Sequence, residues 1–316
     1  MTASVVKSPK ASGNVFIPHF ASYEKKNYKI ISIKENAFNG CHIDSLAFTK
    51  VSEVETFENK CFFNAHIKRL EIPSSVKSLA DGWCDDLYDL REIELSPKNS
   101  HFILYNKDFL LGKSSESSDK FDVLHIARPA IEEAVIPPQV TRIKACSFGH
   151  HKNLETVRFS TNSELKCIED AAFIFSRIES LSLPAGLEQI GDSCFAGTRN
   201  LRKVEISPEN KFLKMMNGKC AVRESSRGSG VFDVIVLAAR GIASISIPPR
   251  IKVINDSAFE YCERLETVTF ESNSSLVSIK SDAFSYISGP ERLLPPSLKE
   301  ADFSSFLNNK NTKVIQ

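Results

Sequence analysis

One stretch of this sequence occurs twice, and the second occurrence aligns with the first without a gap. Residues 136–159 begin with Ile-Pro-Pro and end with Leu-Glu-Thr-Val-Arg-Phe, and residues 247–270 follow the same pattern 111 positions later. A fixed internal period is the signature of a repeat protein, in which each unit packs mainly on its neighbours. The repeat therefore determines the architecture of the chain, although it does not identify a ligand.

A shorter repeat of about 22 to 25 residues runs inside the long one. Its pattern is Val/Leu-x-x-Ile-x-x-x-Ala-Phe, then five or six further residues, then Leu-x-x-Ile-x-Ile-Pro. Alternating apolar residues in the second half indicate a strand with one buried face, and the Ala-Phe half indicates a short turn whose Phe fills the core. Because one copy cannot bury its own apolar face, the copies must stack. Stacking predicts a buried column of phenylalanines, namely Phe148, Phe173, Phe195, Phe259 and Phe284.

Two longer segments interrupt the short repeat, at about 97–136 and 208–247. Each contains two strand-like runs on either side of a polar tip, which is the pattern of a β-hairpin with a mobile loop. The tips span Ser114–Asp119 and Ser225–Gly230. They are interpreted either as contact points for an extended partner or as tolerated insertions without a role.

The remaining segments are defined by their composition. Residues 1–14 are expected to form a flexible leader, residues 15–306 one solenoid, and residues 307–316 a polar C-terminal tail. No apolar run of signal-peptide length follows the N-terminus, and no window approaches the roughly 20 apolar residues of a membrane span. Taken alone, these features predict no membrane insertion, no anchor and a cytoplasmic location.

The Ile-x-x-x-Ala-Phe and Leu-x-x-Ile-x-Ile-Pro halves recur in phase from roughly Ile30 to Phe306. This turn resembles the BspA-like class of leucine-rich repeats, and the insertions are similar to the longer turns of that class. The resemblance implies a leucine-rich-repeat horseshoe, mainly β, with short convex turns and two β-hairpin insertions. It also implies surface antigens and adhesins that bind host proteins, and hence a cell-surface location. It brings no catalytic residues and no cofactor.

Charge and composition narrow the classes of partner. The 40 Lys and Arg residues nearly balance the 39 Asp and Glu residues, which leaves a net charge of +1. Because no polybasic surface is indicated, nucleic acid is not an expected partner. The sequence predicts a monomer whose partner is a protein of unknown identity.

The eight cysteines form no Cys-x-x-Cys pair, so a zinc knuckle or a thioredoxin-type site is not expected. Most of them stand on or beside apolar repeat positions, which predicts buried thiols that act as small hydrophobic side chains. Cys61, Cys84 and Cys194 in particular are expected to be free and slow to react. A disulfide framework is the alternative.

No motif of the chain predicts catalysis, a metal or a cofactor. Every Ser and Cys falls in a repeat position or a polar tip, so no catalytic set is indicated. His150 and His151 lack further ligands at a metal-binding spacing and are predicted to lie in a surface loop. The Gly-Lys-Ser triplet at 112–114 resembles the end of a phosphate-binding loop, but position 107 is a lysine where that motif needs glycine.

The strand residues that alternate with the core positions should line the concave face, which is the usual binding face of repeat proteins. The candidate protein-binding residues are Arg69, Glu71, Glu92, Glu94, Glu133, Thr156, Arg158, Ser180, Ser182, Lys203, Glu205, Thr267 and Thr269. One part of this face is acidic, another carries small hydroxyls, and no aromatic anchor stands among them. The face is interpreted as the binding surface of a non-enzymatic module, adhesin-like or antigenic. A plain solvated sheet face and an intracellular scaffold of the same fold are the alternatives.

Overall fold

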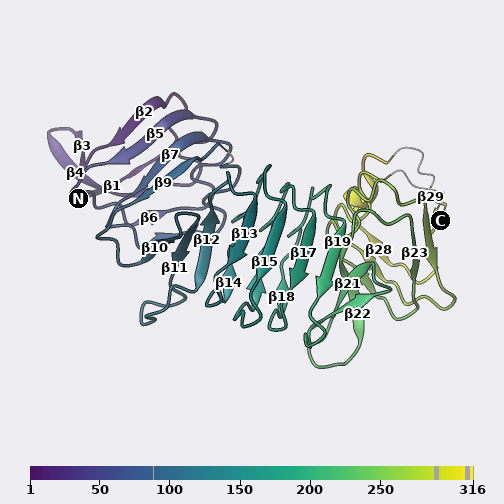
Figure 1. Ribbon diagram of the computed structural model, residues 1–316. Helices are drawn as coiled ribbons and strands as arrows, with labels where there is room; N and C mark the ends of the chain where they lie inside the picture. Colours follow the sequence, from purple (N-terminus) through teal and green to yellow (C-terminus); the bar gives the residue numbers. More distant parts are fainter. Residues whose placement is uncertain (88, 288–291, 310–313, 316) are drawn as a thin grey trace. The chain divides into compact units, whose positions relative to one another are not determined.

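A computed structural model describes residues 1–87, 89–287, 292–309 and 314–315 (Figure 1). The chain forms two compact units: unit 1 contains residues 1–131 and 139–153, and unit 2 contains residues 132–138 and 154–316. Within each unit, successive turns stack strand on strand around a buried apolar core. The predicted fold class, a mainly β repeat solenoid of the leucine-rich type, is confirmed in both units.

The Leu-x-x-Ile-x-Ile halves of unit 1 form a parallel sheet, as their pattern predicts. Its strands are β2 (Ser12–Ile17), β5 (His42–Phe48), β7 (His66–Ile72) and β9 (Glu92–Leu95). In β7, Leu70 and Ile72 are buried whereas Arg69 is exposed, because successive side chains of a strand point to opposite faces.

The corresponding halves of unit 2 form parallel sheets too. The first contains β13 (Glu133–Ile136), β15 (Thr156–Phe159), β17 (Ser180–Leu183) and β19 (Lys203–Ile206). A second pairs β23 (Ser244–Ile247) with β25 (Thr267–Phe270), and a third pairs β27 (Arg292–Leu293) with β29 (Val314–Ile315). A short 3-10 helix, η1 (Phe303–Phe306), follows β28 (Glu300–Ala301).

A second set of short parallel strands runs through the Val/Leu-x-x-Ile halves, and the sequence analysis did not predict it. In unit 1 these strands are β1 (Thr2–Val5), β4 (Lys26–Ile33), β6 (Thr56–Phe57) and β8 (Ser78–Leu79), with β3 (Phe20–Tyr23) antiparallel to β4. In unit 2 they include β16 (Cys167–Ile168), β18 (Gln189–Ile190), β24 (Val253–Ile254) and β26 (Ser278–Ile279). Stacking aligns the same segment of consecutive turns, so its backbone groups pair wherever the chain is briefly extended.

Each insertion has three antiparallel strands, whereas the sequence analysis predicted a two-stranded hairpin. Unit 1 contributes β10 (Phe102–Tyr105), β11 (Phe109–Gly112) and β12 (Val123–Ala127), and unit 2 contributes β20 (Leu213–Met216), β21 (Cys220–Glu224) and β22 (Phe232–Ala238). The last strand of each insertion pairs in parallel with a short strand, β12 with β14 (Arg142–Ile143) and β22 with β24. The last strand of each insertion therefore extends a short-strand sheet.

Both termini differ from the expectation. Residues 1–14, predicted to be a flexible leader, contain β1 and the first half of β2, which pair in parallel with β4 and β5. They form an additional partial turn because Ile17 and the half-buried Val5 and Val15 cover the end of the apolar core. Of the predicted polar tail, residues 314–315 form β29, while residues 310–313 and 316 lie outside the described part of the chain.

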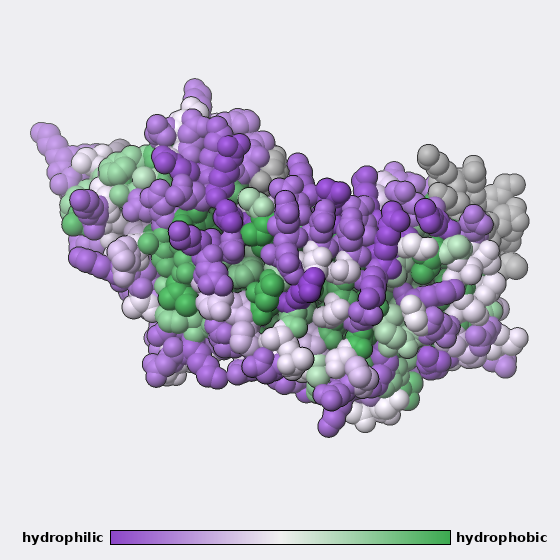
Figure 2. Space-filling model, in the orientation of Figure 1, coloured by the Kyte–Doolittle hydropathy of each residue, from purple (hydrophilic) through white to green (hydrophobic). Residues whose placement is uncertain are grey.

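The core is built from stacked aromatic rings, while hydrophilic residues cover much of the visible face (Figure 2). In unit 2, Phe173 stacks on Phe195 at 5.4 Å, and Phe259 stacks on Phe284 at 4.9 Å between ring centroids. The predicted column is interrupted between these two pairs, because the second insertion places Arg240 there. The Arg240 guanidinium donates hydrogen bonds to backbone carbonyls on both sides, 3.1 Å to Phe195 O and 2.9 Å to Ala258 O.

Candidate functional site

The candidate residues of unit 1 lie on adjacent strands of one sheet. The register places Arg69 opposite Glu92 and Glu71 opposite Glu94, so the predicted acidic residues are neighbours across β7 and β9. Glu71 Oε2 accepts a hydrogen bond of 2.8 Å from the backbone N–H of Phe48 in β5. One of the four charged side chains therefore also holds the sheet together.

The candidate residues of unit 2 belong to two sheets. One row crosses the first sheet from β13 to β19 through Glu133, Thr156, Ser180 and Lys203. Arg158, Ser182 and Glu205 lie two positions further along the same strands. Thr267 and Thr269 belong to the separate sheet of β23 and β25.

Most charges in the first sheet of unit 2 are paired with one another. Arg158 Nε lies 2.6 Å from Glu133 Oε1, and Lys203 Nζ lies 3.0 Å from Glu205 Oε1. The hydrogen bond from Lys203 lowers the pKa of the Glu205 carboxyl. Because all four side chains are largely exposed to water, these pairs contribute little to stability, and the face presents alternating charges without a single-sign field.

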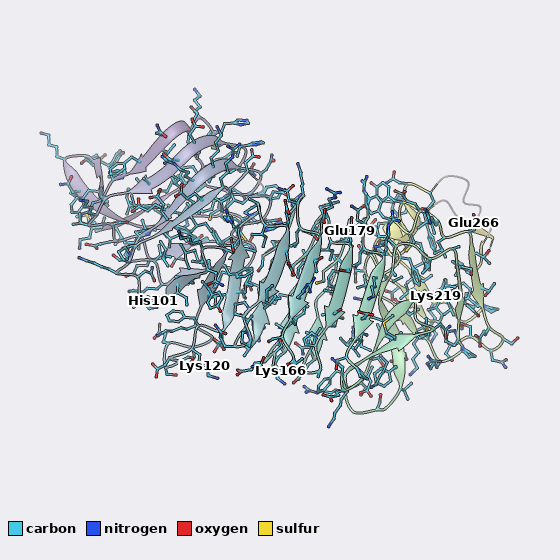
Figure 3. The ribbon with its side chains drawn as sticks, in the orientation of Figure 1. His101, Lys120, Lys166, Glu179, Lys219 and Glu266 are labelled. Carbon is cyan, nitrogen blue, oxygen red and sulfur yellow. The ribbon has the colours of Figure 1, made fainter. Side chains whose placement is uncertain are left out.

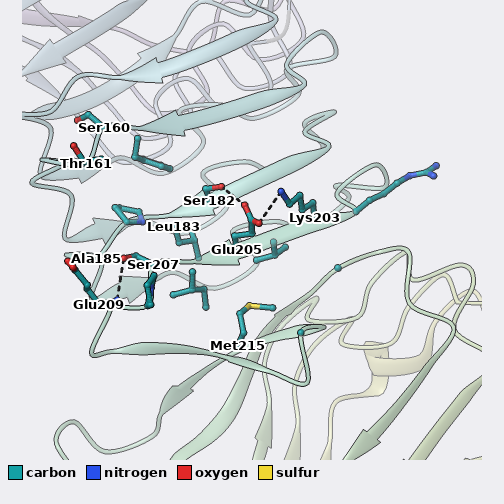
Figure 4. A pocket seen from close by; sticks show the side chains of 18 residues that line it. Ser160, Thr161, Ser182, Leu183, Ala185, Lys203, Glu205, Ser207, Glu209 and Met215 are labelled. Atoms are coloured by element: carbon teal, nitrogen blue, oxygen red, sulfur yellow. Dashed lines mark hydrogen bonds and ion pairs between the residues drawn. The ribbon is translucent and has the colours of Figure 1, made fainter.

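An open groove of about 970 Å³ lies at the C-terminal ends of β15, β17 and β19, facing the second insertion (Figure 4). Its apolar lining includes the half-buried Phe159 and Ile206 from the sheet and Met215 from β20. Lys203 and Glu205 contribute polar groups. The groove combines apolar walls with a few convergent polar groups, which is the usual make-up of a binding cleft.

Strand β19 borders this groove and is the edge of its sheet. It pairs with β17 on one side, and no strand in the described part of the chain pairs with its other edge. The regular turn that would continue the sheet is replaced at this point by the insertion, whose β20 carries Met215. An unpaired strand edge exposes backbone donors and acceptors that a partner strand can bond.

A second cluster, which the sequence analysis did not predict, is aromatic and partly exposed: Phe175 and Tyr286 are exposed, whereas Tyr261 is only 6% exposed. In unit 2, Tyr261 stacks on Tyr286 at 4.4 Å between ring centroids, and the Arg199 guanidinium carbon lies 4.2 Å from the Tyr261 ring centroid. Phe175 is 45% exposed and its ring covers Gly197, where a Cβ atom would collide with it. We call Phe175, Arg199, Tyr261 and Tyr286 the aromatic strip.

Three members of the aromatic strip occupy a strained backbone position. Phe175, Tyr261 and Tyr286 have φ values of 52°, 57° and 56°, in the left-handed region that disfavours large side chains. Each donates its backbone N–H to a carbonyl of the following turn. The corresponding position in unit 1, 111 residues before Phe175, is Asn64, which also has a positive φ. Asparagine tolerates this backbone conformation better than an aromatic residue does.

Both insertion tips are held by an aspartate. Asp122 Oδ1 accepts the backbone N–H of Ser114 at 2.9 Å, and Asp233 Oδ1 accepts that of Ser225 at 2.7 Å. In the second tip, Glu224 accepts two further backbone N–H groups. We call Asp122 and Asp233 the tip clamps; their bonds argue against the expectation that polar composition leaves the tips unanchored.

The predicted surface loop at His150 and His151 is wrong. His151 is 1% exposed, and its ring nitrogens lie 3.1 Å from the backbone oxygens of Gly149 and Ala127, while Nε2 of His150 contacts a carboxylate oxygen of Asp86. Burial lowers the pKa of His151 to about 4. The structural reason is that the chain folds back to the first insertion at this point.

The cysteines lie where the repeat predicts. Seven of the eight are buried and Cys146 is half-buried, and all eight sulfur atoms are free of disulfides in the described structure. Burial raises the pKa of the thiols of Cys61, Cys84 and Cys194 well above the ordinary value. Inert thiols are therefore part of the core packing.

Two further observations concern only the described residues. No group of three or more His, Cys, Asp or Glu side chains is placed to hold a metal ion within residues 1–87, 89–287, 292–309 and 314–315. Nor does any helix in these ranges have the length and apolar character of a membrane span.

The fold and the surfaces can be compared with known proteins. A leucine-rich cell surface protein from Faecalibacterium prausnitzii A2-165 is 18% identical, with a TM-score of 0.53 over 97% of this chain and 73% of that one. A leucine-rich repeat protein from Eubacterium ventriosum ATCC 27560 is 19% identical, with a TM-score of 0.53 over 92% of this chain and 83% of that one. At these identities the likeness concerns the fold alone.

No curated protein matches the sequence. The model of the BspA type leucine-rich repeat region, in contrast, matches it in six copies, over residues 21–106, 127–220 and 237–316. Because these matches cover most of both units, the chain belongs to the BspA-type leucine-rich repeat family.

Proposed function

We propose that this chain is a non-enzymatic protein-binding module, adhesin-like or antigenic, and that it acts at the cell surface. The observation that carries the proposal is the groove beside β19, where an unpaired strand edge meets half-buried apolar side chains. A cell surface protein among the structures of similar fold supports the location. The candidate strand residues that take part are Ser182, Lys203 and Glu205, which line this groove.

The groove suits an extended segment of a partner protein. Such a segment would bond the free edge of β19 through its backbone and place alternate side chains against Phe159, Ile206 and Met215. The Lys203–Glu205 pair offers one charge of each sign to fix the direction of the segment. Main-chain bonds supply affinity in this mode of recognition, and the side-chain contacts supply specificity.

A pair of matched substitutions tests the proposal. Met215→Lys places a charge in the groove, and Leu104→Lys makes the same change at the corresponding position of the first insertion, 111 residues earlier. Short random peptides displayed on phage are selected on the intact wild-type chain, and their affinities for both variants are measured by calorimetry. We expect Met215→Lys to lower the affinity for the selected peptides at least about tenfold. Leu104→Lys should leave this affinity within about twofold of wild type.

The aromatic strip provides the competing outcome. Tyr and Arg dominate the binding energy of many protein interfaces, so the strip is the strongest alternative binding surface in unit 2. Tyr286→Asn removes one of its rings and keeps a residue that tolerates the left-handed backbone. If the selected peptides are lost in Tyr286→Asn and retained in Met215→Lys, the groove is not the binding site.

A further inference from the structure

A small cavity of about 290 Å³ lies under the tip of the first insertion. Residues from three segments line it: Lys77 to Leu79 around β8, His101 and Phe102 at the start of β10, and Lys113 to Glu116 at the tip. His101 is labelled in Figure 3. His125 from β12 completes the lining. All of these residues belong to unit 1.

His125 is a buried polar group without a partner. The residue is 8% exposed, and its Nδ1 is enclosed and makes no hydrogen bond to any described residue. Burial lowers the pKa of His125 to about 3, so at neutral pH the ring is uncharged and carries one N–H. Native proteins rarely leave a buried donor unsatisfied, and such a group calls for an explanation.

The surroundings are built to admit this imidazole. A Cβ atom at Gly112 would lie 2.6 Å from His125 Nε2, so glycine is the residue that lets the ring approach β11. Phe102 packs edge-on against the ring, with 5.2 Å between centroids. Gly112, Lys113 and Ser114 form the triplet that resembles a phosphate-binding loop in sequence; here the glycine makes room for His125 and the other two line the cavity.

The second insertion provides an internal comparison, because its residues correspond one to one with those of the first. Val236 occupies the position that corresponds to His125, so the second insertion has no polar side chain to bury at this place. Arg227 stands where unit 1 has Glu116; it forms an ion pair of 2.5 Å with Glu188 and lies 4.9 Å from the Phe212 ring centroid. The second insertion therefore fills this place with its own side chains, whereas the first leaves a cavity.

The lining of the first cavity is rich in hydrogen-bond donors. The hydroxyls of Ser78 and Ser114 and the ring of His101 make no hydrogen bond to any described residue, and Lys113 Nζ lies over the Phe121 ring at 5.2 Å. Lys77 is paired with Glu55 at 2.8 Å, and the exposed Glu116 is the one carboxylate in the lining. Lysine, hydroxyl and imidazole donors around one small space are the groups that bind an anionic oxygen.

We propose that this cavity binds a small solute through an anionic carboxylate or phosphate group. Lys113 and the hydroxyls of Ser78 and Ser114 bond the anionic oxygens, and His125 donates from Nε2, because its Nδ1 is enclosed. This site is separate from the groove of unit 2, and its occupancy does not depend on protein binding there.

The experiment titrates the intact chain with inorganic phosphate and, separately, with acetate, and follows the histidine ring signals by NMR. We expect at least one of the two anions to shift the His125 signal saturably at concentrations up to about 10 mM. The anion with the lower dissociation constant identifies the group, phosphate or carboxylate.

Two variants copy the second insertion and should therefore fold. His125→Val replaces the imidazole with the residue at 236, and Lys77→Glu combined with Glu116→Arg rebuilds the ion pair that closes the second site. Both variants are expected to bind the anion at least about tenfold more weakly than wild type. Circular dichroism is used to check that they fold. In the variants, binding is followed by the ring signal of His101, which also lines the cavity. The proposal is overturned if neither anion saturates the His125 signal of wild type, or if anion binding in the folded His125→Val variant equals that of wild type.

Discussion

The stacked phenylalanines allow a sharp test within a single turn of unit 2. Phe173 and Phe175 are two residues apart, but Phe173 is fully buried against Phe195 at 5.4 Å, whereas Phe175 is 45% exposed with a φ of 52°. Phe173→Ala removes a ring from the core. Phe175→Asn removes a ring from the surface and places a residue that tolerates the left-handed backbone.

The two substitutions should have very different effects on the free energy of unfolding. Truncating a fully buried Phe to Ala costs about 3–5 kcal/mol, from lost burial and from the cavity that remains. For a unit of this size such a loss lowers the melting temperature by on the order of 10 °C. Phe175→Asn should change the unfolding free energy by less than about 1 kcal/mol, because the lost contact with Gly197 is offset by relief of backbone strain.

Urea unfolding followed by far-UV circular dichroism measures both variants beside wild type. The reasoning would be refuted by equal losses in the two variants, or by a larger loss in Phe175→Asn. Either result would mean that the aromatic strip carries core-like packing energy, or that stacking does not transmit the defect at Phe173 to the neighbouring turns.

Three further predictions follow from buried polar groups. In the native protein, Cys61, Cys84 and Cys194 should react slowly with an alkylating reagent, so mass spectrometry after mild alkylation should find these thiols unmodified. Rapid labelling of all three would contradict their burial. The folded pKa of His125, about 3, lies below the unfolded value of 6.5, so its contribution to stability is complete above pH 6.5 and is lost as pH falls toward 4. This loss should be on the order of 3 kcal/mol and should disappear in His125→Val, as measured by urea midpoints at both pH values. Arg240→Leu should lower the unfolding free energy by roughly 2–4 kcal/mol, because buried carbonyls lose their donors; an unchanged midpoint would show that water replaces the guanidinium.

The regular turns could be predicted from the sequence because a stacked repeat leaves each position one environment. Phe173, Phe259 and Phe284 share one slot of the pattern, and all three are at most 1% exposed. The same periodicity predicts which strand residues point away from the core. The pairing of β13, β15, β17 and β19 places such residues side by side, as in the row from Glu133 to Lys203. Burial at a repeated slot is a local property, so pattern alone determines it.

The remaining features depend on contacts between distant segments. No local sequence pattern marks Arg240 as buried, because its carbonyl acceptors, Phe195 O and Ala258 O, come from the turns on either side of it. Apart from β1 and β4, the short strands named above are two residues long, which is too few for a period to appear. The aromatic strip had a signal that went unused, because comparison at an offset of 111 aligns Asn64 with Phe175 and Tyr286. This alignment can be interpreted only when the structure shows that all three positions have a left-handed backbone.

The groove was missed for a related reason. Its strand residues were predicted, but Met215 reaches them from an insertion whose position relative to β19 no local pattern encodes. Sequence periodicity predicts which side chains leave the core. It does not predict which of them meet across a break in the repeat.

The tip clamps have a practical consequence for engineering. Because Asp122 and Asp233 fasten the base of each tip through the backbone N–H of its first residue, Ser114 or Ser225, the residues beyond the clamp carry little of the fold. Their identity can change while the strand register below stays fixed, as the different charges of Glu116 and Arg227 at matching places already show. Each insertion is thus a ready-made graft site, in which a foreign peptide of similar length can be displayed on a rigid frame and exchanged between the two copies.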